Sequence, residues 1–387
     1  MNIDMDTKER IKIFVDAHTF DSEFQGSRTF IWEIHHILAQ KETLELYIGA
    51  YDTKGLAKYF PGIPTDHLIK FKSRSSVMRL LFDIPAIIKK YRIQYAHFQY
   101  IVPLYKNCRY IVTIHDVLFR DYPAEFSFFY RFFKTILYKA GAARADILTT
   151  DSSFSASSIQ KYLGIKKEKI HLVPVAVHDK HFALYDKIKA KEDFKSKYGF
   201  DKYILFVSRI EPRKNHAFLL RSFIELHLYR QGYHLVLLGH KSINTPAFNE
   251  IMDHLPEDIK PFIFIKSDVP DEELLLFYHA ATVFVYPSKA EGFGIPPLEA
   301  AASQVPVICS NTSAMNDFSF FGKNHIDPSD YHLLKDALQN IIKDPPGEME
   351  LSDIAETIHQ KYSWNRSAEH LYRLIINDHN GIGKSNL

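Results

Sequence analysis

The feature that most constrains this fold is the alternation of short apolar runs with segments of helical periodicity along most of the chain. This alternation is typical of parallel β-sheets whose strands are joined by crossover helices. In the first half of the sequence, the candidate strands are residues 11–16, 44–49, 67–71, 95–98, 110–115, 146–150 and 170–175. We therefore expect an α/β domain with a doubly wound, Rossmann-like parallel sheet.

The pattern restarts after a polar, lysine-rich stretch at residues 178–197. The second set of candidate strands is residues 203–208, 234–238, 262–265, 282–286 and 305–309. At 387 residues the chain is too long for one ordinary core, since a domain has about 100–200 residues. We expect two Rossmann-like domains, residues 1–185 and 186–387. The final helix, at about 364–378, has no strand after it and could pack on either domain.

Two such domains in tandem would face a central cleft, because ligands of open α/β sheets bind at the carboxyl ends of the strands. A hinge is expected in the polar stretch at 178–197, with closure that excludes water from a bound ligand.

The composition limits which cellular compartment and which kinds of partner we expect. Apolar residues make up 46% and charged residues 24% of the chain, which is ordinary for a globular protein. Two separated cysteines, Cys108 and Cys309, cannot form a disulfide framework, so we expect a reducing cytoplasm. No ligand cluster has zinc spacing and no nucleic-acid motif is present, so we expect no metal, no cofactor and no nucleic-acid partner.

The charges are unevenly distributed along the chain, although the net charge is only +2. Asp83 is the only acid between residues 67 and 109, and residues 119–144 interleave aromatic with basic side chains. Such a surface could make peripheral contact with an anionic membrane. For a cytoplasmic protein, this membrane would be the inner face of the plasma membrane. Alternatively, the aromatic side chains simply pack a helix onto the sheet.

A glycine turn joins the candidate strand at 282–286 to a helix and carries a carboxylate at each end, Glu291 and Glu299. Two prolines suit the first helical turn, which leaves free amides before them to face an anion. These amides belong to Phe293, Gly294 and Ile295. We expect Glu299 in the first turn, where it either accepts hydrogen bonds from ribose hydroxyls or only complements the helix dipole.

The loop after the strand at 203–208 carries three cations, Arg209, Arg213 and Lys214, directly before a helical run. An arginine can fork two phosphate oxygens and a lysine supplies a point charge, so the loop suits a diphosphate. Together they could neutralise a leaving diphosphate without a metal. The alternative is a solvated loop between a strand and a helix.

Residues 209–215 together with the stretch from Glu291 to Glu299 resemble the signature of glycosyltransferase family 4. This is a family of retaining sugar transferases with the two-Rossmann-domain GT-B fold. Residues 113–117, 150–155, 173–177 and 305–311 also resemble the family, so the similarity covers about residues 11–375.

The resemblance implies roles for particular residues. Arg209 and Lys214 would bind the diphosphate of the donor, Glu299 its ribose, and Glu291 the transferred sugar near the anomeric centre. His115 would line the sugar from the other domain. Gly26 lies where the family places a glycine loop against the donor. Weaker candidates for the acceptor site are Asp116, Asp16 and Arg28, although either aspartate could equally cap a helix or hold a loop.

The stretches at 97–100 and 114–119 are most similar to bacterial mannosyltransferases that extend lipid-linked O-antigen or capsule chains. We therefore expect a retaining transfer of mannose from GDP-mannose, a nucleotide-sugar co-substrate, to a glycan or lipid-linked acceptor in surface polysaccharide synthesis. Two alternatives stay open. One is a sugar-nucleotide epimerase or hydrolase on the same fold, and the other is a non-catalytic scaffold.

Overall fold

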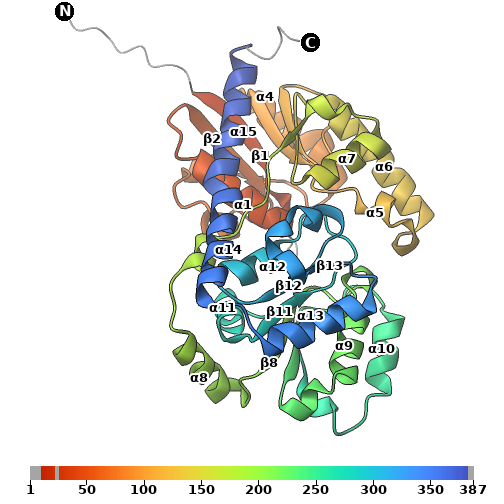
Figure 1. The fold of residues 1–387 in the computed structure, drawn as a ribbon. Coiled ribbons are helices and arrows are strands. Elements are labelled where there is room, and N and C mark those ends of the chain that lie inside the picture. Colours follow the sequence, from red (N-terminus) through yellow and green to blue (C-terminus); the bar gives the residue numbers. More distant parts are fainter. Residues whose placement is uncertain (1–9, 22–25, 382–387) are drawn as a thin grey trace, which may run out of the picture. The chain divides into compact units, whose positions relative to one another are not determined.

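A computed structural model describes residues 10–21 and 26–381 and divides the chain into two compact units (Figure 1). Unit 1 comprises the chain up to Val175 together with the chain from Trp364, and unit 2 is Ala176–Ser363. The sequence placed the boundary at 185/186, whereas the chain enters unit 2 after Val175.

Unit 1 is built on a seven-stranded parallel sheet with the strand order β3-β2-β1-β4-β5-β6-β7. The strands are β1 (Ile11–Asp16), β2 (Leu44–Ala50), β3 (Leu68–Lys70), β4 (Tyr95–Gln99), β5 (Arg109–Thr113), β6 (Ile147–Thr150) and β7 (Ile170–Leu172). The order reverses between β1 and β4, so this unit has the switch point of a doubly wound sheet.

Successive side chains of β4 point to opposite faces of the sheet, so their contacts show which helices of unit 1 cover each face. The major helices are α1 (Gly26–Leu38), α4 (Ile84–Tyr91), α6 (Phe128–Arg144), α7 (Ser153–Leu163) and α15 (Trp364–His379). Ala96 and Phe98 belong to the apolar cluster that also contains buried side chains of α4, α6 and α7. Tyr95 and His97 point the other way, because they hydrogen-bond with Asp378 of α15 and His35 of α1.

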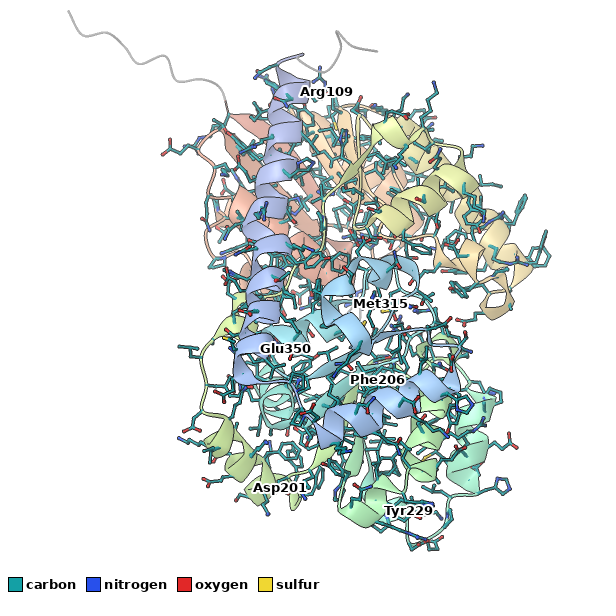
Figure 2. All side chains as sticks on the ribbon, in the orientation of Figure 1. Arg109, Asp201, Phe206, Tyr229, Met315 and Glu350 are labelled. Atoms are coloured by element: carbon teal, nitrogen blue, oxygen red, sulfur yellow. The ribbon has the colours of Figure 1, made fainter. Side chains whose placement is uncertain are left out.

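Helix α15 returns from the far end of the sequence to pack beside α1 (Figure 1). Its Glu369 accepts a hydrogen bond of 2.8 Å from Lys41. Near its last turn, Asp378 Oδ2 lies 2.7 Å from Arg109 Nη1, and Figure 2 labels Arg109 beside this end of the helix. The final helix is therefore part of unit 1, although the whole of unit 2 precedes it in the sequence.

Unit 2 has a six-stranded parallel sheet in the order β10-β9-β8-β11-β12-β13. The strands are β8 (Tyr203–Val207), β9 (His234–Leu238), β10 (Ile263–Lys266), β11 (Val283–Tyr286), β12 (Val307–Ser310) and β13 (His325–Ile326). The helices are α8 (Lys187–Tyr198), α9 (His216–Glu225), α10 (Pro246–Asp253), α11 (Asp271–Ala280), α12 (Ile295–Ala302), α13 (Tyr331–Lys343) and α14 (Glu348–Lys361). The sequence did not indicate β13.

Helix α8 occupies much of the stretch at 178–197, which the sequence suggested as a polar connector and hinge. Asp186 caps this helix by accepting from the amides of Ile188 and Lys189. Phe194 is fully buried, and α8 packs on α11. This stretch is therefore folded within unit 2, and the chain passes between the units at Val175 and Trp364.

Candidate active site

The site in unit 2 begins where the loops after β8 and β9 touch at the carboxyl edge of the sheet. The Ser208 amide donates to the Leu238 carbonyl at 2.8 Å. Gly239 follows with φ +143°, and a Cβ atom at this position would lie 2.1 Å from the Ser208 carbonyl oxygen. Only glycine fits this close approach, which places the cationic loop at residues 209–214 over the sheet edge.

The three cations of this loop have different environments. The side chain of Arg209 is about half exposed and lies 3.1 Å from the buried carboxylate of Glu211. Arg213 is buried and donates to Glu211 at 2.9 Å and to the Ala290 carbonyl at 2.6 Å. Arg213 therefore ties this loop to the loop after β11, whereas Arg209 remains accessible to a ligand.

Lys214 is buried against Glu291, with 2.6 Å between Nζ and Oε1. Tyr286 accepts a second hydrogen bond from Nζ at 3.0 Å. Because an ammonium group has three donors, one remains for a ligand.

Glu291 is held as a carboxylate by its surroundings. Ser288 Oγ donates to its Oε1 at 2.5 Å, and Arg213 Nη1 lies 3.3 Å from Oε2. Burial alone would raise the pKa of Glu291, but Lys214 and Arg213 outweigh burial and lower it to about 2. Glu291 therefore accepts hydrogen bonds and does not donate a proton near neutral pH.

The glycine turn opens α12 as the sequence predicted. Gly294 precedes the helix with φ +100°, and a Cβ atom there would lie 2.8 Å from Cγ of Met315, which Figure 2 labels. Among the described residues, the amides of Phe293, Gly294 and Ile295 have no hydrogen-bond partner. Three amides at the positive end of a helix are suited to an anion.

Glu299 lies in the second turn of α12, so its expected place in the first turn is wrong. Tyr278 donates to Glu299 Oε2 at 2.9 Å, and His181 Nε2 lies 3.7 Å from Oε1. Burial raises the pKa of Glu299, although about a quarter of its side chain is exposed. Because the helix dipole acts mainly within the first turn, dipole compensation explains Glu299 poorly.

In unit 1, His115 is buried at the carboxyl edge, two residues after β5. Its Nδ1 lies 2.8 Å from Asp151 Oδ2, and its Nε2 lies 3.3 Å from Gln99 Oε1. Burial lowers the pKa of His115, but Asp151 outweighs this effect and the net shift is upward. The sequence prediction missed Asp151, whose position directly after the predicted strand at 146–150 was the available signal.

Two residues near the start of α1 were predicted to contact substrates. Gly26 is exposed at the first position of α1, and an added Cβ atom would meet nothing within 4 Å. Arg28 lies over the rings of Phe20 and Tyr59 and hydrogen-bonds the Tyr59 hydroxyl. A substrate contact of either residue stays a prediction.

The two weaker acceptor candidates already have partners within unit 1. Asp16 is buried, with His18 at 3.2 Å and Arg79 at 3.3 Å. Burial opposes ionisation of Asp16, but these two neighbours outweigh it and lower its pKa. Asp116 accepts a 3.0 Å hydrogen bond from the Leu118 amide and so holds its own loop. A role of either aspartate at the acceptor also stays a prediction.

The described residues lack a metal-binding cluster and a membrane-spanning helix. No group of three His, Cys, Asp or Glu side chains between residues 10 and 381, leaving aside 22–25, is placed to hold a metal ion. Over the same residues, no helix combines the length and apolarity needed to cross a bilayer.

Both units match sequence models of known protein families. The sequence model of the family described as Glycosyltransferase Family 4 matches residues 25–181, and that of Glycosyl transferases group 1 matches residues 187–358. Together with the two Rossmann-like domains, these matches show that the chain has the fold of the GT-B glycosyltransferases. Each half of the chain therefore matches a glycosyltransferase family model, as the resemblance in the sequence indicated.

A curated relative and two solved structures are also similar to this chain. The chain is 28% identical over 241 residues to the O-antigen chain mannosyltransferase RfbU of Salmonella typhimurium, and the match spans 62% of each chain. The chain thus spans about three-fifths of the length of this relative. Sucrose-phosphate synthase from Thermosynechococcus elongatus matches in structure with a TM-score of 0.73 at 17% identity, over 96% of this chain and all of that one. Anabaena HepE, solved with UDP and glucose, matches with a TM-score of 0.71 at 13% identity, over 95% of this chain and all of that one.

Proposed function

We propose that this chain transfers a sugar from a nucleoside diphosphate donor to a glycan or lipid-linked acceptor, with retention of the anomeric configuration. The observation that carries the proposal is the Lys214–Glu291 pair at the same sheet edge as the unpartnered amides of residues 293–295. These groups offer a cation, an anion and backbone donors, which suit a sugar attached to a diphosphate.

Each part of the donor has a matching group in unit 2. Arg209, the remaining donor of Lys214 and the amides of residues 293–295 bind the diphosphate. Glu291 accepts from hydroxyls of the transferred sugar, since Lys214 and Arg213 keep it ionised. Glu299, held by Tyr278, accepts from the ribose.

The chemical step follows from the charge state of Glu291. A general base needs a pKa near the working pH, and Glu291 at about 2 is far below it, so it is a poor acceptor for the proton of the attacking hydroxyl. We therefore assign the acceptor's proton to the leaving diphosphate, on the same face of the sugar. Arg209 and Lys214 stabilise the charge that develops on the diphosphate, which favours an oxocarbenium-like transition state.

Mannose from GDP-mannose is our proposal for the donor, because RfbU is described as an O-antigen chain mannosyltransferase. The O-antigen description of RfbU also supports a role in surface polysaccharide synthesis, and its location at the cytoplasmic face of the membrane is part of the proposal. HepE was solved with UDP and glucose, so UDP-sugars belong in every donor panel.

The test is a transfer assay with GDP-mannose, UDP-glucose and ADP-glucose against free and lipid-linked glycan acceptors, with product linkage determined by NMR. We expect transfer of mannose with the donor's anomeric configuration retained. Lys214→Ala should lower turnover about 10²-fold or more, while Lys260→Ala, on the surface of unit 2, should match the unchanged protein. Inverted product would contradict the mechanism, and free sugar or an epimer formed from donor alone would favour a hydrolase or an epimerase.

A further inference from the structure

Helix α6 of unit 1 is held by a short buried segment and presents the rest of its surface to solvent. Ser127 caps it by accepting from the Tyr130 amide. Its buried residues are Tyr138, Gly141 and Ala142. Gly141 lies so close to the preceding loop that a Cβ atom would be 2.2 Å from the Tyr100 carbonyl oxygen. The helix is therefore packed through its C-terminal half, beside α7 in Figure 1.

Large apolar side chains line the outward face of α6. They are Phe128, Phe129, Phe132, Phe133, Ile136 and Leu137, with exposed fractions from 43% to 71%. These residues form three adjacent pairs that are spaced four positions apart, and this spacing places them on one face of a helix. The ring centroids of Phe128 and Phe132 lie 6.2 Å apart, and those of Phe132 and Phe133 lie 5.6 Å apart, so the apolar face is continuous. A face of this kind marks an interaction site.

The charges of α6 identify the kind of partner. The helix contains no acidic residue and carries Arg131, Lys134, Lys139 and Arg144. Arg131 lies over the Phe128 ring at one edge of this face, whereas Lys134 lies over the rings of Tyr130 and the buried Tyr138. Cations can bury their stems and keep their charges at a polar boundary. Two copies of α6 packed face to face would instead bring like charges together.

We propose that the outward face of α6 docks on the surface of an anionic lipid bilayer, with its Phe, Ile and Leu side chains in the acyl boundary and its cations among the headgroups. Apolar insertion supplies most of the affinity, and the cations supply the preference for anionic lipid. The docking surface is independent of the donor chemistry. Its failure and that of the proposed function are therefore distinguishable.

The test is co-sedimentation of the full chain with vesicles of phosphatidylglycerol and phosphatidylethanolamine, or of phosphatidylcholine alone, at low and high salt. We expect binding to the anionic vesicles that persists in part at high salt. The double variant Phe129→Ser, Phe133→Ser should bind at least about tenfold more weakly, since each removes a large apolar contact. Lys139→Gln, at an exposed position of the helix, should reduce the preference for phosphatidylglycerol.

A matched control removes equally exposed apolar side chains from unit 2, namely Leu184→Ser with Met349→Ser, which are 95% and 80% exposed. This control should bind vesicles as the unchanged protein does. If Phe129→Ser, Phe133→Ser changes the circular dichroism spectrum, Phe128→Ser with Phe132→Ser replaces it on the same face.

Three results would overturn the proposal. The first is no sedimentation of the unchanged protein with anionic vesicles. The second is an equal loss of binding in the unit 2 control. The third is a dimer in light scattering that the Phe129→Ser, Phe133→Ser variant converts to a monomer without any vesicle binding, which would assign the face to a second copy of the chain.

Discussion

Replacement of Lys214 by methionine tests the buried ion pair at the centre of the unit 2 site. Lys214 and Glu291 are each only 8% exposed, and their charged atoms are 2.6 Å apart. The pKa of Glu291 falls from 4.5 to about 2 despite its burial, and Lys214 is the largest cause of the fall. One pKa unit corresponds to about 1.4 kcal/mol, so the shift of Glu291 is worth about 3 kcal/mol, and burial, which lowers the pKa of Lys214, offsets part of it.

We expect Lys214→Met to lower the free energy of unfolding of unit 2 by about 2–4 kcal/mol at pH 7, because it leaves a buried carboxylate with Arg213 as its remaining cation. The lowered pKa also determines how the free energy of unfolding changes with pH. In the unchanged protein, the lowered pKa of Glu291 gives a stabilisation that is present above about pH 4.5 and is lost as the pH falls toward 2. In the variant this pKa rises, so the difference in stability between the two proteins should narrow as the pH falls toward 2.

The assay is urea unfolding followed by two signals. Trp32 and Trp364, the chain's two tryptophans, both belong to unit 1, so tryptophan fluorescence follows unit 1 while far-UV circular dichroism follows both units. The variant should shift a circular dichroism transition and leave the fluorescence transition in place.

Lys260→Met is the matched control for this substitution. Lys260 pairs with Glu257 at 2.5 Å, but the two side chains are 44% and 88% exposed. Its loss should cost less than about 1 kcal/mol. If Lys214→Met lowers the free energy of unfolding by no more than Lys260→Met does, the buried ion pair does not stabilise unit 2 as we expect.

Three further substitutions test other parts of the structure. Gly294→Ala places a Cβ atom 2.8 Å from Met315 at a φ of +100°, so the turn and its free amides must shift, and donor affinity measured by calorimetry should fall about tenfold or more; unchanged affinity would remove the glycine turn from the site. Asp151→Asn removes the anion that raises the pKa of His115, so NMR titration should give a lower pKa for this histidine, and a higher one would contradict the pairing. Leu371→Ala in α15, at a fully buried position, should destabilise unit 1 by about 2–5 kcal/mol in the fluorescence transition, and a change below about 0.5 kcal/mol would argue against the packing of this helix on unit 1.

Much of the fold follows from the periodicity of apolar residues. The strands from β1 to β12 lie where the apolar runs predicted them, with ends that differ by up to three residues. β13 was missed because two residues, His325 and Ile326, are too few to show a period. α8 was missed because its lysine-rich sequence buries only Ala190 and Phe194, which leaves little helical periodicity.

The candidate site was predictable in its residues but not in their pairing. The glycine turn and the cationic loop each have a local signature, so both were found from the sequence. Arg209 and Arg213 are equally basic in the sequence, and only the fold shows that Arg213 is buried against Glu211 while Arg209 is exposed. Tyr278 belongs to a different helix from Glu299, and such a contact between distant segments has no signal in a single sequence.

The central claim is that the carboxyl edge of the unit 2 sheet binds a nucleoside diphosphate sugar. Isothermal titration of the unchanged protein, Glu299→Gln and Lys214→Met with GDP-mannose, UDP-glucose and ADP-glucose tests it most directly. The account predicts that one donor, GDP-mannose by our proposal, binds with a stoichiometry of one without added metal, and that each substitution weakens binding about tenfold or more. Absence of binding by all three donors, or equal affinity in all three proteins, would contradict it.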